Sequence, residues 1–253
     1  MSPRGWRRVA GCAVSAIAAL ALPAAGPPED LCPTLPASGL VTNERAYREP
    51  YAPGARLSGD WLVTSGSLFA HHGAGWTGWP DGGSPDLASA DATGSAVFRM
   101  VSRRADFGDV TVTAWIELRA YVSTGRTPAQ GLDGVHFWLR YQSAQELYAV
   151  SVVRRDGLVV VKRKVPGGPS NGGTYTTLGS VRHPYRGGKL WVCARVRNVA
   201  GGAAVRIDVA LDGEPVLSVL DTAPGRLLRP GAVGIRGDNA DFLFGDFLAA
   251  PSP

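Results

Sequence analysis

The stretch VHFWLRYQSAQELYAVSVVRRDGLVVVKRK, residues 135–164, decides the fold because three strand-like runs follow one another within it. Polar residues from Gln142 to Glu146 separate the first run from the second, and Asp156-Gly157 separates the second from the third. An Asp-Gly pair tolerates the positive φ angles of a tight hairpin turn. The stretch therefore predicts a β-meander of three antiparallel strands.

The side chains of this meander are predicted to divide between two faces, because they alternate along a strand with a period of two. We expect Tyr141 to face Leu147 and Arg155 to face Leu158. This register gives a mostly apolar face of Val135, Phe137, Leu139, Ala149, Ser151, Val153, Leu158 and Val160. The other face collects His136, Trp138, Arg140, Tyr148, Val150, Val152, Arg154 and Arg163. Because such a mixture is poorly suited to a dry core, we predict that the second face binds a ligand.

The composition favours a single all-β domain. The chain has 253 residues, of which 45% are hydrophobic, and it contains 33 glycines and 19 prolines. Short runs of Val, Leu, Ile and Thr between Gly, Asp and Asn turns are typical of an antiparallel sandwich. We predict a β-sandwich domain over residues 39–250, preceded by an extended, proline-containing arm over residues 26–38.

Residues 1–25 resemble a secretory signal peptide. Arginines at positions 4, 7 and 8 precede an apolar run from Val9 to Leu22, which is shorter than the roughly 20 residues of a membrane span. We expect cleavage near Ala25, secretion, and no stable membrane insertion of the mature protein. Losing three arginines lowers the formal net charge from +5 to +2. Since the remaining basic residues are interspersed with acids, we expect no nucleic-acid partner.

The cysteine count predicts one disulfide in the exported protein. Cys12 lies in the predicted leader, which leaves Cys32 and Cys193. Two cysteines in an oxidising compartment ordinarily pair. The rival interpretation, a metal site, lacks further cysteines or a spaced pair of histidines. We therefore predict a Cys32–Cys193 bridge that ties the N-terminal arm to a late strand.

A long loop from His71 to Ala92 and one central strand supply candidate ligand contacts. Long loops in compact domains are often functional, and indole rings stack on sugars while polar groups fix hydroxyls. Alternatively, the loop's tryptophans merely cover the end of the sandwich. The strand from Val110 to Arg119 adds an aromatic and an acidic side chain on its polar side. The candidate set is His71, His72, Trp76, Trp79, Asp81, Trp115, Glu117 and Trp138.

Five segments in order are similar to the concanavalin A-like superfamily, especially its laminin-G-like and 3-keto-disaccharide-hydrolase-like jelly rolls. They are DWLVTSGSLF, ADFGDVTVTAWI, the meander quoted above, VRIDVALDGEPVL and GAVGIRGDNADFLFGDF, and they span about residues 57–248. The resemblance implies two packed antiparallel sheets, one of them concave, with ligands on the concave face or at the rim loops. It does not fix the function, because this fold hosts lectins, adhesion modules, glycoside hydrolases and polysaccharide lyases.

Two kinds of catalysis are weighed against binding. The E-x-D-x-x-E run of laminarinase-like glycosidases is absent, and Glu117 is the only acid expected on the polar face of a central strand, although acids from the rim loops could contribute. A polysaccharide lyase needs a Tyr or His that removes a proton and an Arg that neutralises the charge of a uronate. His136, Arg140 and Tyr148 would supply these groups. The structural alternative is that Arg140 and Tyr148 form a packed pair.

One late turn could hold calcium. Asp238, Asn239 and Asp241 offer hard oxygen ligands suited to that ion. Turns rich in Asp and Asn are also common without any metal, and no other cofactor is expected.

The sequence therefore predicts a secreted, monomeric carbohydrate-binding β-sandwich that recognises a glycan on its concave face and rim loops. Several tryptophans without a carboxylate motif favour binding over turnover. The alternatives are a polysaccharide lyase or glycoside hydrolase on the same fold, and a structural or adhesion module.

Overall fold

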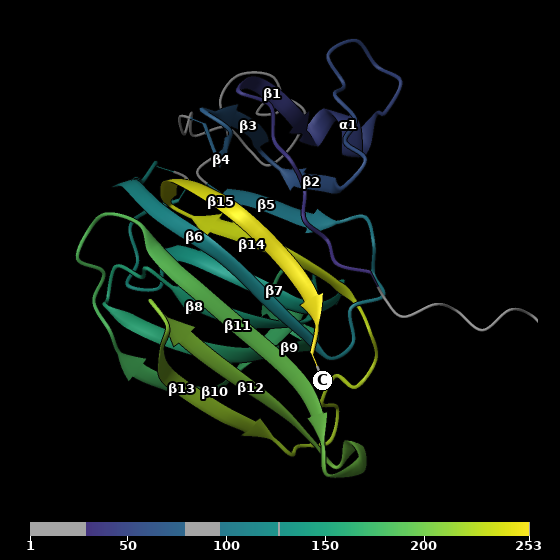
Figure 1. Cartoon of the computed structure of the whole chain (residues 1–253), viewed down its shortest axis with the longest axis vertical. Helices are drawn as coiled ribbons and strands as arrows, with labels where there is room; N and C mark the ends of the chain where they lie inside the picture. Colours follow the sequence, from purple (N-terminus) through teal and green to yellow (C-terminus); the bar gives the residue numbers. More distant parts are fainter. Residues whose placement is uncertain (1–28, 79–96, 126, 253) are drawn as a thin grey trace, which may run out of the picture.

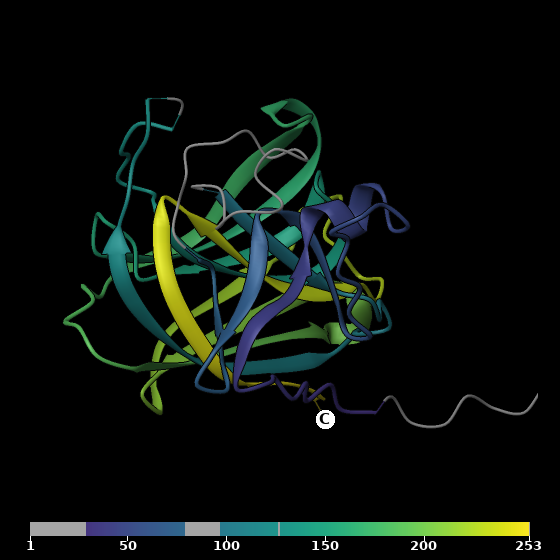
Figure 2. The same cartoon turned by 90° about the horizontal axis from the view of Figure 1, so that it is seen from above.

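The computed structural model describes residues 29–78, 97–125 and 127–252, which form two antiparallel sheets packed face to face (Figures 1 and 2). In chain order the elements are β1 (Ser38–Asn43), α1 (Glu44–Arg48), β2 (Trp61–Ser65), β3 (Ser67–His71), β4 (Ala74–Trp76), β5 (Val97–Ser102), β6 (Val110–Tyr121), β7 (Gly134–Ser143), β8 (Glu146–Val152), β9 (Leu158–Ser170), β10 (Gly173–Arg182), β11 (Leu190–Val199), the 3-10 turn η2 (Ala200–Gly202), β12 (Ala204–Leu211), β13 (Glu214–Asp221), β14 (Ala232–Asp238) and β15 (Ala240–Pro251).

The predicted two-sheet antiparallel jelly-roll sandwich is confirmed. The eight-stranded sheet has the order β1-β3-β4-β15-β6-β11-β12-β13, and the seven-stranded sheet has the order β10-β9-β8-β7-β14-β5-β2. Figure 1 shows β6, β11 and β12 side by side in front of β7, β8 and β9. Late strands complete both sheets, since β15 lies between β4 and β6 and β14 lies between β7 and β5.

The core lies between the two sheets, where alternate side chains of each strand are buried. In β6, Val112, Ala114 and Ile116 are fully buried, whereas Trp115 and Glu117 point to the outer side of the eight-stranded sheet. This alternation is the one predicted from the sequence. The described part of the chain has no helix long and apolar enough to cross a membrane.

The N-terminal arm lies along the edge of β15 before it enters the sheet. Leu31 and Ala249 exchange two backbone hydrogen bonds of 2.9 Å, and regular pairing begins with β1. Residues 1–25, the predicted signal peptide, lie outside the described residues.

The predicted disulfide is wrong, because both Cys32 and Cys193 are free thiols in this structure. Leu31 pairs with β15, and β6 separates β15 from β11, which carries Cys193. Three strand spacings of 4.7 to 4.9 Å put the two cysteines roughly 14 Å apart, well beyond the reach of a disulfide.

The predicted register of the first hairpin is also wrong, by one residue. Tyr148 lies opposite Leu139, not Arg140, and Ser143 lies opposite Glu146 across a two-residue turn. The register shifts between Leu139 and Ser143, where Arg140 has a φ of +48°. Because a slip of one residue exchanges the faces of a strand, β8 and the following β9 are inverted relative to the prediction.

Candidate functional site

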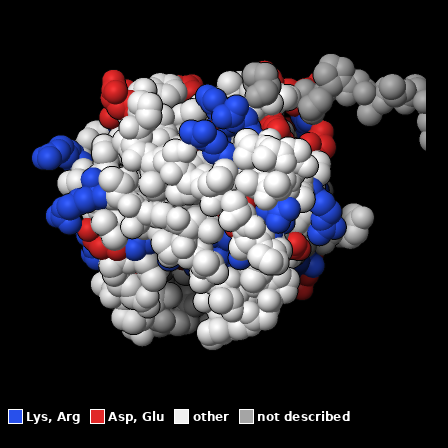
Figure 3. Space-filling view, turned by 90° about the horizontal axis from the view of Figure 1, so that it is seen from below, with Lys and Arg blue, Asp and Glu red and all other residues white. Residues whose placement is uncertain are grey.

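A groove lies on the outer face of the seven-stranded sheet, on the side away from the eight-stranded sheet. Its main pocket, of about 280 Å³, lies between Leu132 on one side and the tip of the β9–β10 hairpin on the other. In the view from below, this side of the molecule is indented between two lobes, at the lower edge of Figure 3. The floor and walls consist of Leu132, His136, Trp138, Ala149, Ser151, Arg154, Lys162, Lys164, Pro169, Ser170, Asn171, Tyr175, Arg236 and Asp238.

A second pocket extends this groove. It has a volume of about 220 Å³ and shares Leu132, Arg236 and Asp238 with the first. The depth has a simple cause in β8, which presents the small side chains of Ala149 and Ser151 to the outer face between longer ones on its neighbours. We call the residues lining the main pocket the sheet groove.

Strand alternation places the basic side chains of the sheet groove. In β9, Val159 and Val161 are fully buried in the core between the sheets, so Lys162 and Lys164 point outward. In β14, Ile235 is a core residue and Arg236 lines the groove beside it.

A histidine, an aspartate and an arginine form one polar cluster at the end of the groove. His136 Nδ1 is 2.7 Å from Ser151 Oγ, and its Nε2 is 3.2 Å from Asp238 Oδ2. Arg236 donates to Asp238 Oδ1 at 2.6 Å. Burial lowers the pKa of His136 more than Asp238 raises it. Burial alone would raise the pKa of Asp238, but Arg236 and His136 together hold it below its usual value.

Two lysines and a tyrosine line the groove beside this cluster, and Tyr175 contacts Arg236. The ammonium groups of Lys164 and Lys162 lie 4.9 and 5.7 Å from the centre of the Tyr175 ring. Lys164 donates one hydrogen bond of 2.6 Å to the carbonyl oxygen of Ala144. Burial and then the charges of Arg236 and Arg99 lower the pKa of Lys164 to about 8. Neither lysine has a carboxylate partner within the described parts of the chain.

Trp138, predicted to contact the ligand, does lie in the groove. Its indole stacks on the ring of Tyr141, with a centroid distance of 5.1 Å and an interplanar angle of 17°. Only 2% of Trp138 is exposed, so it forms the base of the site, and Tyr175 is the less buried aromatic side chain of the lining.

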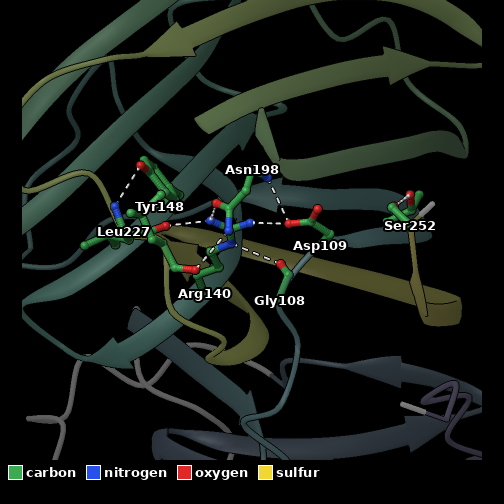
Figure 4. Close-up of polar contacts among 9 residues, drawn as sticks. Gly108, Asp109, Arg140, Tyr148, Asn198, Leu227 and Ser252 are labelled. Carbon is green, nitrogen blue, oxygen red and sulfur yellow. Dashed lines mark hydrogen bonds and ion pairs between the residues drawn. The ribbon is translucent and has the colours of Figure 1, made fainter. Parts of the chain in front are cut away.

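Arg140 and Tyr148, predicted as catalytic partners of His136, instead lie between the sheets (Figure 4). Arg140 is completely buried and donates four hydrogen bonds. Its acceptors are the carbonyl oxygens of Gly108 and Leu227, the side-chain oxygen of Asn198, and Asp109 Oδ1 at 2.7 Å.

The hydroxyl of Tyr148 is equally engaged. It donates to Asp221 Oδ2 at 2.7 Å and accepts from the Leu227 backbone N–H at 3.1 Å. Arg163 donates to the same carboxylate at 2.9 Å. Burial and the contact with Asp221 raise the pKa of Tyr148. His136 lies on the opposite face of the sheet, so the predicted catalytic trio is not assembled.

The remaining predicted ligand contacts belong to the eight-stranded sheet. Trp115 Nε1 donates to Asp246 at 3.1 Å, the ammonium of Lys189 lies 4.0 Å from its ring, and Glu117 pairs with Arg119 at 3.1 Å. His71, His72 and Trp76 cluster at the β3–β4 hairpin, where the rings of His71 and Trp76 are 5.8 Å apart. Trp79 and Asp81 lie outside the described residues. The structure therefore does not bring Trp115, Glu117, His71, His72 or Trp76 to the sheet groove.

The described residues contain no group of three or more metal-binding side chains. Asp238 is paired with Arg236, whereas Asp241 accepts hydrogen bonds from the Trp76 indole at 2.8 Å and from Thr77 at 3.4 Å. Because the carboxylates of Asp238 and Asp241 already accept hydrogen bonds from separate donors, the described residues do not assemble the calcium site predicted at Asp238, Asn239 and Asp241.

The register prediction explains which groove residues were missed. Ser151, Lys162, Lys164 and Tyr175 were not proposed as ligand contacts, and the first of these was assigned to the core face. Lys162 and Lys164 alternate with Val161 and Arg163, so a core position for Val161 is the signal that could have revealed the two lysines.

No protein-family model matches the sequence, and comparison with curated proteins finds no match. Among solved structures, an endo-1,3-beta-glucanase from Streptomyces sioyaensis is 14% identical with a TM-score of 0.48, over 91% of this chain and 100% of that chain. The exoplasmic/lumenal domain of VIP36, in a Ca2+/Man3GlcNAc-bound form, is 12% identical with a TM-score of 0.48, over 77% and 86%. The alginate lyase Aly36B is 12% identical with a TM-score of 0.45, over 86% and 98%.

Two packed antiparallel sheets, the architecture that the sequence resemblance implied, are present in this chain. At such identities and TM-scores the likeness concerns the fold alone. The function therefore has to be argued from the residues of the groove.

Proposed function

We propose that this chain is a secreted carbohydrate-binding β-sandwich protein that holds a glycan in the sheet groove. The observation that carries the proposal is the groove itself, an open pocket of about 280 Å³ continued by one of about 220 Å³. Each volume alone is below the roughly 300 to 1,000 Å³ typical of small-molecule sites, but two adjoining pockets that share residues suit a chain of sugar units.

The chemistry of the lining supports the same proposal. Sugar rings present apolar C–H faces and many hydroxyls, which require an aromatic surface surrounded by donors and acceptors. Tyr175 offers the ring, and Ser151, Asn171 and Lys162 offer polar groups around it. Binding is favoured over turnover because Arg140 and Tyr148, the other two members of the predicted lyase site, are buried between the sheets.

The test is a glycan panel read out with the wild-type full chain and two aromatic variants. Tyr175→Ala removes the ring from the groove, whereas Trp191→Ala removes a tryptophan that is 47% exposed on the eight-stranded sheet. We expect Tyr175→Ala to weaken binding about fivefold, since an aromatic contact contributes roughly 1 kcal/mol. Trp191→Ala should leave affinity unchanged.

The opposite pattern, with loss only in Trp191→Ala, would move the site to the other sheet. Flat responses across neutral and acidic glycans would contradict carbohydrate binding and favour a structural or adhesion module.

A further inference from the structure

The charges of the sheet groove do not balance. Its main pocket is lined by four basic side chains, Arg154, Lys162, Lys164 and Arg236, and by one acidic side chain, Asp238. Asp238 is paired with Arg236, and Arg154 is paired with Asp156. Among the described residues neither lysine forms an ion pair, and Asp156 and Asp238 act on Lys162 only over a longer distance.

Of the two lysines, Lys164 is held where bulk water screens its charge poorly, whereas Lys162 is half-buried. Lys164 is only 2% exposed, and its one hydrogen bond among the described residues goes to the neutral carbonyl of Ala144. Arg99 and Arg236 act on Lys164 as further positive charges and, with burial, lower its pKa. Buried charges are normally paired, and an unpaired one is costly. An anion placed in the groove would supply the missing partner.

We propose that the glycan bound in the sheet groove is acidic, and that Lys162 and Lys164 hold its carboxylate or sulfate group beside Tyr175. This inference rests on the proposed function and adds the chemical class of the ligand. Lysine binds such groups as a compact positive charge with several rotatable donors, so both anionic groups suit it. The ring of Tyr175 would pack against the sugar to which the anion is attached.

Outside the sheet groove, basic side chains are interspersed with acidic ones. This distribution favours an anion site confined to the groove over a general affinity for polyanions. Over the face seen from below, basic and acidic side chains are interspersed (Figure 3). On the eight-stranded sheet, Arg206 and Arg197 share Asp208 at 2.9 and 3.5 Å. In the sheet groove, by contrast, Lys162 and Lys164 form no ion pair with a described residue.

The experiment compares matched ligands by titration calorimetry with the full chain. A uronic-acid oligosaccharide is paired with its methyl ester, a sulfated oligosaccharide is paired with its desulfated form, and a single-stranded oligonucleotide serves as a non-glycan polyanion. The groove variant is Lys162→Gln with Lys164→Gln. The control is Lys189→Gln, which removes the ammonium beside Trp115 on the opposite sheet.

We expect one acidic oligosaccharide to bind at least about tenfold more tightly than its neutral counterpart, because a hydrogen bond to a charged group contributes roughly 1.5 to 3 kcal/mol. The double lysine variant should lose this preference, and Lys189→Gln should keep it. A preference within the uronic-acid pair would identify the bound group as a carboxylate, and a preference within the sulfated pair would identify it as a sulfate. Circular dichroism of the double variant checks that it is folded.

Equal binding of acidic and neutral partners, unchanged in the double variant, would overturn the inference and leave glycan binding intact. Binding of the oligonucleotide as tightly as of the acidic glycan would also overturn it, since the lysines would then be a general polyanion site. No binding to any glycan would overturn the proposed function itself.

Discussion

Arg140 and Lys164 are both basic side chains with almost no exposed surface, yet their surroundings differ. Arg140 lies between the sheets and donates four hydrogen bonds, one of them to a carboxylate. Lys164 lies under the sheet groove and donates one hydrogen bond to a neutral carbonyl. The protein supplies its own partners to Arg140, whereas the partner of Lys164 has to come from outside. A satisfied buried cation thus indicates a structural role, and an unsatisfied one at a pocket indicates a ligand.

The strongest test of this comparison is Arg140→Leu. It leaves the Asn198 side-chain oxygen and the carbonyl oxygens of Gly108 and Leu227 without this donor, and leaves Asp109 with the Asn198 N–H. Several hydrogen bonds to a buried charged group, at roughly 1 to 3 kcal/mol each, contribute about 3 to 5 kcal/mol together. We expect a loss of that size in the free energy of unfolding, measured by urea denaturation. The control is Arg119→Leu, whose exposed pair with Glu117 should contribute less than about 1 kcal/mol. Equal losses in both variants would show that Arg140 has no special structural role.

A smaller effect is expected from Tyr148→Phe. The change removes a hydroxyl that bonds both Asp221 and the Leu227 N–H, so we expect a loss of about 1 to 3 kcal/mol in unfolding free energy. Glycan affinity should not change, because the hydroxyl points away from the groove. Tyr51→Phe, at a tyrosine that is 97% exposed, is the control and should be nearly neutral.

The lyase hypothesis makes the reverse prediction for Tyr148→Phe. Unchanged stability together with lost cleavage of a uronate polymer would restore Tyr148 as a catalytic residue.

The sequence predicts this fold well because it depends on patterns that repeat along many strands. The alternation in β6 and the presence of three strands in the meander are confirmed. His136 and Trp138 were placed on the correct face, since both precede the irregularity of β7.

The site could not be predicted as well, because it depends on one local backbone feature. Arg140 adopts a positive φ at the register shift of β7, and nothing in its residue type signals this, since non-glycine residues rarely do so. That single shift put Tyr148 into the core and brought Lys162 and Lys164 to the surface of the groove. The charged groups that act on Lys164 are Arg99 on β5 and Arg236 on β14, and both strands are far from β9 in the sequence.

The finest test of the comparison is the pH dependence of ligand binding. The pKa of Lys164 is lowered to about 8 from an ordinary 10.5, with Arg236 on β14 and Arg99 on β5 as the charged groups that, after burial, lower it. Lys164 therefore loses its charge as the pH rises through about 8, and affinity for an acidic glycan should fall by up to about tenfold between pH 7 and 9.

The contribution of Lys164 to the free energy of unfolding should rise with pH, whereas its contribution to glycan affinity falls. Between about 8 and 10.5 the unfolded chain binds the Lys164 proton more readily than the folded protein, so the contribution of this residue to stability rises with pH. Affinity is measured by calorimetry, and the free energy of unfolding by denaturation, at several pH values. Lys164→Gln should remove the contribution of Lys164 to the pH dependence of both quantities. Lys189→Gln should leave both pH dependences unchanged. An affinity that does not depend on pH in the wild-type chain would mean that Lys164 carries no charge that the ligand needs. The lysine would then resemble Arg140 in role, as a buried group that serves only the fold.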